Sequence, residues 1–191
     1  MKKLNLSDIE AVEPGEREKL PAGAYIVRIE GFEDNEDKEY VRFVFDVNEG
    51  PRAGFYSDDY YKEKPWMHAL MFSYKDKALP MTKGRLEKVT ECNPGFDAVA
   101  AFEAAQLDMF KGRKMGLVVG TEDRIFKGED GWVQVTDLDW MRAKIIPLDK
   151  VRSGDFTVPE HRELSASDKA KLGGGASTAP AGGNVYGDID L

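Results

Sequence analysis

Two alternating runs, over residues 24–32 and 40–47, limit the possible folds more than any other feature of the sequence. In both runs apolar residues recur at every second position, and β-branched and aromatic residues are frequent. A two-residue period indicates a strand with one buried face and one solvent-facing side. A third segment, 54–61, follows a turn and is rich in tyrosine. We predict that the three segments form an antiparallel meander, because their connections are too short for parallel crossovers.

The spacing of apolar residues changes to steps of three and four over 65–105 and returns to strand-like patterns over 115–146. In the first of these regions we predict three helical segments, which begin at Pro65, Thr82 and Asp97. In the second, the turn at 127–131 predicts a hairpin. Three strands, a helical segment and further strands form the element order of the oligonucleotide-binding (OB) fold. The sequence therefore predicts a mainly β, α+β domain: an OB-like five-stranded barrel with a helical insert between strands 3 and 4.

Length and composition add few limits. The 191 residues suffice for one domain of ordinary size, and the single cysteine excludes an intramolecular disulfide. No apolar run approaches the roughly 20 residues of a membrane span, and the N-terminus lacks the apolar core of a signal peptide. We therefore expect a cytoplasmic protein without membrane contact. We divide the chain into an N-terminal lead-in (1–19), an OB-like domain (20–160), and a linker with a disordered acidic C-terminal tail (161–191).

The last predicted strand, 137–146, places an aromatic ring and two cations on one face, at Trp140, Arg142 and Lys144. Such a face can stack a base and neutralise phosphates of a single strand. The alternative interpretation is that the aromatic residues belong to the core and that the lysines are solvated. The candidate nucleic-acid-binding residues are Arg28, Tyr40, Arg42, Tyr56, Tyr60, Lys62, Lys64, Trp66, Lys75, Trp140, Arg142 and Lys144.

The net charge is −8, from 35 acidic and 27 basic residues. A nucleic-acid site would therefore have to be a local basic groove on an acidic body. Catalytic signatures are absent: there is no nucleophile motif, no glycine-rich phosphate loop and no Cys/His metal spacing. We expect no enzyme activity, no cofactor and no metal. A weaker alternative is a metal-dependent nuclease accessory that uses Asp58, Asp137 and Asp139.

Four blocks of the sequence carry a resemblance to a phage and prophage family whose members are regarded as candidate single-stranded-DNA-binding proteins. The blocks lie at 20–25, 73–79, 91–96 and 153–159. The resemblance spans roughly residues 20–160 and implies a role near replication and recombination enzymes in a bacterial host cytoplasm. The blocks correspond to turns and helix ends and not to catalytic motifs.

The glycine-rich C-terminal segment resembles the tails of bacterial single-stranded-DNA-binding proteins. Those tails usually carry more consecutive aspartates and end in Pro-Phe, whereas this one ends in Asp188, Ile189, Asp190 and Leu191. We expect these four residues to bind a protein partner. The sequence as a whole predicts a non-catalytic protein that binds single-stranded DNA. The alternative is an OB-like adaptor that recruits replication or recombination enzymes. Sequence preference and oligomeric state stay open.

Overall fold

The computed structural model describes residues 18–128 and 131–173 of the protein. The chain divides into two compact units, and each is described by itself. The larger unit comprises residues 20–121 and 138–162. The described part of the smaller unit comprises residues 18–19, 122–128, 131–137 and 163–173. Among the described residues, none of the helices combines the length and apolarity that crossing a membrane requires.

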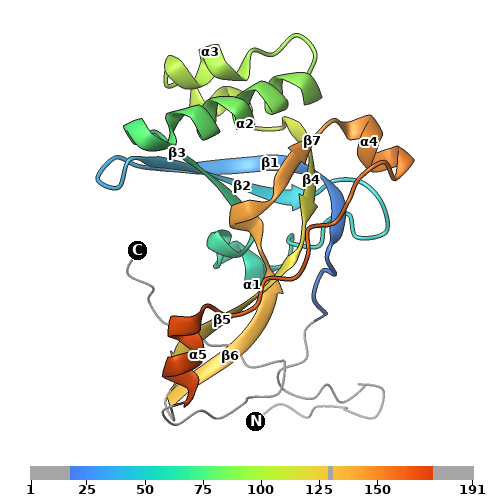
Figure 1. Ribbon diagram of the computed structural model, residues 1–191. Helices are drawn as coiled ribbons and strands as arrows, with labels where there is room; N and C mark the ends of the chain where they lie inside the picture. Colours follow the sequence, from blue (N-terminus) through green and yellow to red (C-terminus); the bar gives the residue numbers. More distant parts are fainter. Residues whose placement is uncertain (1–17, 129–130, 174–191) are drawn as a thin grey trace, which may run out of the picture. The chain divides into compact units, whose positions relative to one another are not determined.

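An antiparallel five-stranded sheet forms the centre of the larger unit, with the strand order β3-β2-β1-β4-β7 (Figure 1). The predicted strand 40–47 is confirmed at both ends, and the predicted strand 24–32 lies within β1. Within the described residues β3 and β7 do not pair, so the predicted barrel is not closed. The strands are β1 (Gly23–Asn35), β2 (Tyr40–Val47), β3 (Ala69–Ser73), β4 (Lys114–Val119) and β7 (Lys144–Ile146).

One face of this sheet carries the core. Val27 and Ile29 of β1 and Phe43 and Phe45 of β2 are at most 1% exposed, and they alternate with more accessible residues. Figure 1 shows helices α2 (Leu79–Cys92) and α3 (Ala98–Glu103) together above the sheet. Residues of both helices belong to the same apolar cluster as the four strand residues. The remaining short elements of the unit are α1 (Asp59–Lys62), α4 (Leu148–Ser153) and the 3₁₀ helices η1 (Pro65–His68), η2 (Asp76–Ala78), η3 (Leu107–Phe110) and η4 (Trp140–Arg142).

The helical insert between the third and fourth strands is confirmed, and local signals explain its two main helices. Pro80 lies in the first turn of α2, where its missing N–H costs nothing. Leu86, Val89 and Cys92 recur on the buried side of this helix. The predicted cap of α3 is also present, because the Asp97 carboxylate accepts a hydrogen bond from the Ala100 N–H at 3.0 Å.

The predicted third strand, 54–61, is wrong. Gly54 has φ +78° within a turn, and the segment continues into α1. The third strand is β3, which lies inside the segment predicted to be helical from Pro65. Ala, Leu and Met favour helices locally, but β3 pairs with β2 and buries Leu70 and Phe72 almost completely. Tertiary burial thus overrides local propensity here.

The predicted strand 137–146 is also wrong as one continuous element. Strand β6 (Gly131–Leu138) ends before Asp139, whose carboxylate accepts a hydrogen bond from the Arg142 N–H at 3.2 Å. This cap starts η4, and only the last three residues form β7. Trp140, Arg142 and Lys144 therefore do not share a strand face.

Side chains of α2 bind backbone carbonyls of the strand β3 and of the 3₁₀ helix η4. The Arg85 guanidinium donates to the Met71 carbonyl of β3 and to the Met141 carbonyl of η4, both at 2.7 Å. The Thr82 hydroxyl donates to the Ser73 carbonyl at 2.6 Å. Because β2 is the only strand of residues 18–128 and 131–173 that pairs with β3, the bonds to Met71 and Ser73 satisfy carbonyls of an edge strand.

The smaller unit is built on a two-stranded sheet. Strand β5 (Thr121–Gly128) pairs with β6, which confirms the hairpin predicted from the turn at 127–131. Helix α5 (Ala166–Gly173) belongs to the same unit. Its Lys171 ammonium lies 5.3 Å from the ring centroid of Trp132 in β6, which is a cation–π contact.

Candidate functional site

A pocket of about 560 Å³ lies on the face of β1 and β2 that alternates with the core face. Arg28 of β1 and Asp46 of β2 lie opposite each other in the strand register and both line it. The register shifts between Ile29 and Gly31, so Glu30 occupies a β-bulge at the pocket. Bulges re-aim side chains beside binding sites. A pocket of this volume is within the usual range for small-molecule and nucleotide sites.

The segment 56–68 forms the other side of the pocket and is fastened to the end of β2. Beyond Val44, β2 no longer pairs with β3. The segment 56–68 instead contacts the backbone of this part of β2. The buried His68 ring places Nδ1 2.5 Å from the Phe45 carbonyl oxygen and Nε2 3.2 Å from the Tyr61 carbonyl oxygen. The wall of the pocket is therefore held to the sheet by buried polar contacts.

The Asp46 carboxylate is held in a fixed orientation. Its Oδ1 accepts hydrogen bonds from the backbone N–H groups of Val47 at 2.7 Å and Tyr56 at 2.8 Å. Among the described residues no hydrogen bond to the second oxygen, Oδ2, is found. Because Asp46 lines the pocket, one oriented acceptor oxygen remains available there.

Tyr56 belongs to the core as well as to the pocket. Its ring stacks on His68, with centroids 4.6 Å apart and 10° between the planes, and it is 6% exposed. Burial raises the pKa of its hydroxyl, which also accepts a hydrogen bond from the Trp140 side chain. Tyr56 is therefore a neutral, fixed part of the pocket wall with little ring area for stacking.

Basic and aromatic residues alternate over 60–66, within the segment that forms the wall of the pocket. The Lys64 ammonium lies 3.7 Å from the ring centroid of Tyr60. The Lys62 ammonium, which lines the pocket, lies 2.8 Å from Asp59. Trp66 is 43% exposed, an unusual exposure for a tryptophan. The structure thus brings Arg28, Tyr56, Tyr60, Lys62, Lys64 and Trp66 of the predicted set to the pocket or to the segment that forms its wall.

Three other predicted residues lie toward the opposite end of β2 or beyond it. Tyr40 is 5% exposed, and its hydroxyl accepts a hydrogen bond from Arg42 at 3.1 Å. Arg42 also pairs with Glu33 at 3.2 Å, and Glu33 lines the far end of the pocket. Lys75 is exposed in the turn before η2.

The three residues predicted on the last strand do not belong to the pocket lining. Trp140 is 8% exposed and packs in the core. The Arg142 side chain is 68% exposed and lies 3.9 Å from Asp139, while Lys144 is exposed on β7. None of the three lines the 560 Å³ pocket. The predicted tail residues Asp188, Ile189, Asp190 and Leu191 lie outside the described residues.

Each carboxylate of the nuclease alternative has a structural role. Asp58 caps α1, accepting a hydrogen bond from the Tyr61 N–H at 3.0 Å. Asp139 is buried beside Arg162, 3.4 Å away. Across residues 18–128 and 131–173, no group of three or more His, Cys, Asp or Glu side chains is arranged to hold a metal ion.

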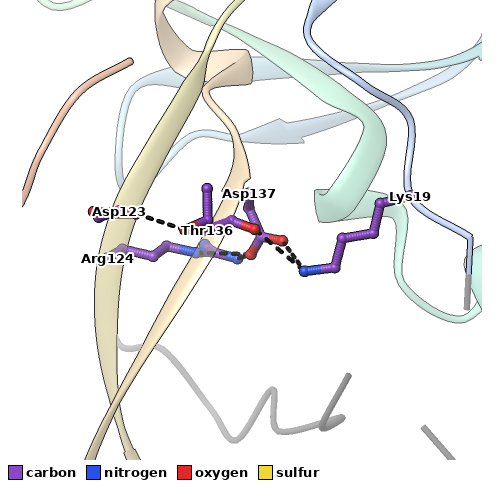
Figure 2. A network of polar contacts seen from close by, with 5 residues as sticks. All are labelled: Lys19, Asp123, Arg124, Thr136 and Asp137. Atoms are coloured by element: carbon purple, nitrogen blue, oxygen red, sulfur yellow. Dashed lines mark hydrogen bonds and ion pairs between the residues drawn. The ribbon is translucent and has the colours of Figure 1, made fainter. Parts of the chain in front are cut away.

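Asp137 belongs to a polar network within the smaller unit (Figure 2). Arg124 donates to its Oδ2 at 2.7 Å and Lys19 to its Oδ1 at 3.1 Å, so the carboxylate links two cations. Next to it, the Thr136 hydroxyl donates to Asp123 at 2.6 Å. Burial raises the pKa of Asp137, but the charges of Arg124 and Lys19 outweigh that effect and hold it below the ordinary 3.8.

The sequence analysis missed several residues of the pocket: Glu30, Phe32, Val44, Asp46, Pro65 and His68. Phe32 carried a signal, because it ends an alternating run and remains 38% exposed. The bulge at Glu30 has no local sequence signature.

No family model matches the chain, and no curated protein shows significant similarity to it. The fold and this pocket are therefore the guides to function.

Proposed function

We propose that this protein binds single-stranded DNA without catalysis, in the bacterial cytoplasm, during phage replication or recombination. One observation carries the proposal: the segment 60–66 presents Lys62, Lys64 and the exposed Trp66 beside a pocket on an accessible sheet face. The order of strands and helices supports an OB-like architecture, in which that face and its loops bind oligonucleotides. The proposed architecture differs from a closed OB barrel, because β3 and β7 do not pair within the described residues.

In this proposal the residues have different roles. The accessible ring of Trp66 stacks a base, because every base has a π-face and the contact needs no sequence match. Lys62, Lys64 and Arg28 meet phosphates around the pocket. Arg28 and Lys62 are ion-paired with Glu30 and Asp59, so phosphates must compete with these carboxylates. Binding is therefore moderate and strongly salt-dependent.

The direct test is a fluorescence-anisotropy titration of the whole protein with a labelled mixed-sequence single strand at low and near-physiological salt. Affinity should fall with salt, and Lys64→Ala should reduce the logarithmic salt slope by about 0.7, the value for one lost phosphate contact on a single strand. Lys83→Ala, an exposed lysine of α2 outside the pocket lining, is the matched control. No binding at low salt contradicts the proposal.

A second candidate is the protein-interaction adaptor, and one observation favours it. The turn between β1 and β2 contains five acidic residues and one lysine within 33–39, and Glu30, Glu33 and Asp46 outnumber the two cations of the pocket lining. Such a surface suits a basic protein and repels phosphates. If oligonucleotides do not bind at low salt, the adaptor becomes the function to test.

Partner recruitment through Asp188, Ile189, Asp190 and Leu191 is part of the same proposal. The acidic groups of this segment compete with DNA phosphates for the same cations, so DNA binding and exposure of the segment are coupled reciprocally. A truncation to residues 1–173 should bind single strands more tightly than the whole chain at low salt, where screening is weak. Equal affinities at low salt contradict the coupling and leave recruitment alone.

A further inference from the structure

We infer that the pocket between β1, β2 and the segment 56–68 reads one base of the bound strand, and that Asp46 makes it prefer bases with an exocyclic amino group over thymine. The inference rests on the proposed function and adds a base preference to it. It goes beyond Trp66, whose stacking contact is indifferent to base identity. The two contacts are therefore separable by experiment.

The shape and lining of the pocket fit a single base. Its volume of about 560 Å³ exceeds that of a base and leaves room for part of the sugar. Phe32, Val44 and Pro65 supply apolar contacts, and the polar lining consists of Arg28, Glu30, Glu33, Asp46, Ser57, Lys62 and His68. Apolar contacts combined with a fixed polar group are the usual design of a site that orients one small planar ligand.

The polar groups differ in how freely they move. The Glu30 carboxylate pairs with Arg28 at 2.7 Å, and both side chains are more than two-fifths exposed. Asp46 is fixed by the backbone N–H groups of Val47 and Tyr56, so its orientation is set by the fold. A reading group has to be held in place, since a mobile carboxylate loses part of its discrimination to conformational entropy.

The chemistry of the free Asp46 oxygen sets the preference. An ionised carboxylate only accepts hydrogen bonds, so it bonds the amino groups of cytosine, adenine or guanine. Thymine presents the O2 and O4 carbonyl oxygens on either side of its single N3–H. Opposed to the carboxylate, those oxygens leave acceptors facing each other without a donor between them, which is unfavourable. Cytosine, which has the same ring size as thymine, gives the cleanest comparison.

The substitution Asp46→Asn distinguishes the roles of the two carboxylate oxygens. The amide oxygen can keep both backbone hydrogen bonds at the Oδ1 position, which leaves the NH₂ group at the position of Oδ2. The pocket then presents a donor in place of an acceptor. Thymine becomes the better ligand, and the preference between the two pyrimidines reverses.

The experiment compares labelled oligo-dC and oligo-dT of equal length by fluorescence anisotropy with the whole protein at low salt. We expect oligo-dC to bind about tenfold more tightly than oligo-dT, which corresponds to one base-edge contact. Asp46→Asn should favour oligo-dT. Asp76→Asn, an exposed aspartate outside the pocket lining with the same charge change, should leave the ratio unchanged.

A modified ligand keeps the test independent of how the variant folds. An oligonucleotide of N4,N4-dimethylcytosine has no amino hydrogens and should lose the preference against the unaltered protein. Equal affinities of the unaltered protein for oligo-dC and oligo-dT overturn the base-reading inference and leave the proposed function standing. Absence of binding to both overturns the proposed function, and the inference with it.

Discussion

The indole ring of Trp140 packs edge-on against the ring of Phe45, with centroids 4.9 Å apart. Trp140 is the first residue of the capped turn η4 and lies in the core of the larger unit, where it is 8% exposed. A tryptophan followed by two cations at alternating positions suggested a nucleic-acid surface. In the structure, the tryptophan instead completes the apolar cluster around β2.

Trp140→Ala should therefore act on stability. Deleting a large buried aromatic side chain costs about 3–5 kcal/mol of unfolding free energy, from lost transfer energy and the cavity that remains. Urea unfolding followed by circular dichroism measures the loss. A loss below about 1 kcal/mol would show that the ring is not packed as described.

Trp66→Ala should have the opposite profile, because Trp66 is 43% exposed. Its unfolding free energy should change little, whereas affinity for single strands should fall by about 1–3 kcal/mol through the lost stacking contact. Leu79→Ala is the matched control, since Leu79 is 44% exposed and does not line the pocket. Anisotropy titrations of the unaltered protein and of both variants test this expectation. Equal affinities of the unaltered protein and Trp66→Ala refute the stacking role of Trp66.

Two glycines should respond oppositely to replacement by alanine. A Cβ at Gly116 would lie 2.6 Å from the Ile146 carbonyl oxygen and 2.7 Å from a Val151 methyl group, so Gly116→Ala overpacks the core and should cost about 1–3 kcal/mol. Gly84 lies inside α2, and a Cβ added there would have no neighbouring atom of another part of the chain within 4 Å. Gly84→Ala should therefore stabilise the protein by about 0.5–1 kcal/mol. Thermal unfolding of both variants measures whether stability falls or rises. A Gly116→Ala protein of unchanged stability contradicts the close approach of Gly116 to Ile146 and Val151.

Arg85→Met should destabilise the larger unit by about 2 kcal/mol, because two backbone carbonyls lose a charged donor. Methionine keeps the length and apolar contacts of the side chain. Lys83→Met, two residues earlier and exposed on the same helix, is the control and should change stability by less than about 0.5 kcal/mol. Equal stabilities of the two variants in urea would refute the bridging role of Arg85.

The hairpin of the smaller unit should weaken at low pH. Because the pKa of Asp137 is lowered in the folded state, its contribution to stability is present above the ordinary value of 3.8 and is lost as pH falls through the lower folded value. Hydrogen-exchange protection of β5 and β6 amides, with the β1–β4 ladder as internal reference, measures this loss. Asp137→Asn should abolish the dependence, and an unchanged profile in that variant contradicts it.

Local signals predicted the elements whose residues are both patterned and bounded. The strand 40–47 alternates strictly and is preceded by a charged turn, and the helix at 82–92 has a periodic apolar side and a firm stop at Asn93. The third strand was not predictable in this way, because Ala69 to Ser73 favour a helix alone and become a strand only by pairing with β2. Asp139 did carry a signal for the break at Trp140, since aspartate is a preferred cap.

The candidate site was predictable only in part. Basic and aromatic residues at 60–66 were found from composition, because exposure follows from their charge and spacing. The pocket beside them depends on a bulge at Glu30 and on the bond between Asp46 and Tyr56, ten residues later. Neither has a periodic signature. The position of a carboxylate on a strand was visible, but its fixed orientation was not.

The bonds from Arg85 and Thr82 to β3 determine how copies of this chain can associate. A strand added from another molecule would need the Met71 and Ser73 carbonyls as acceptors, and both already accept hydrogen bonds from α2. Edge-to-edge growth of the sheet through β3 would thus require displacing a guanidinium and a hydroxyl from their partners. The helix that covers the core therefore also protects the protein against aggregation by strand addition at this edge.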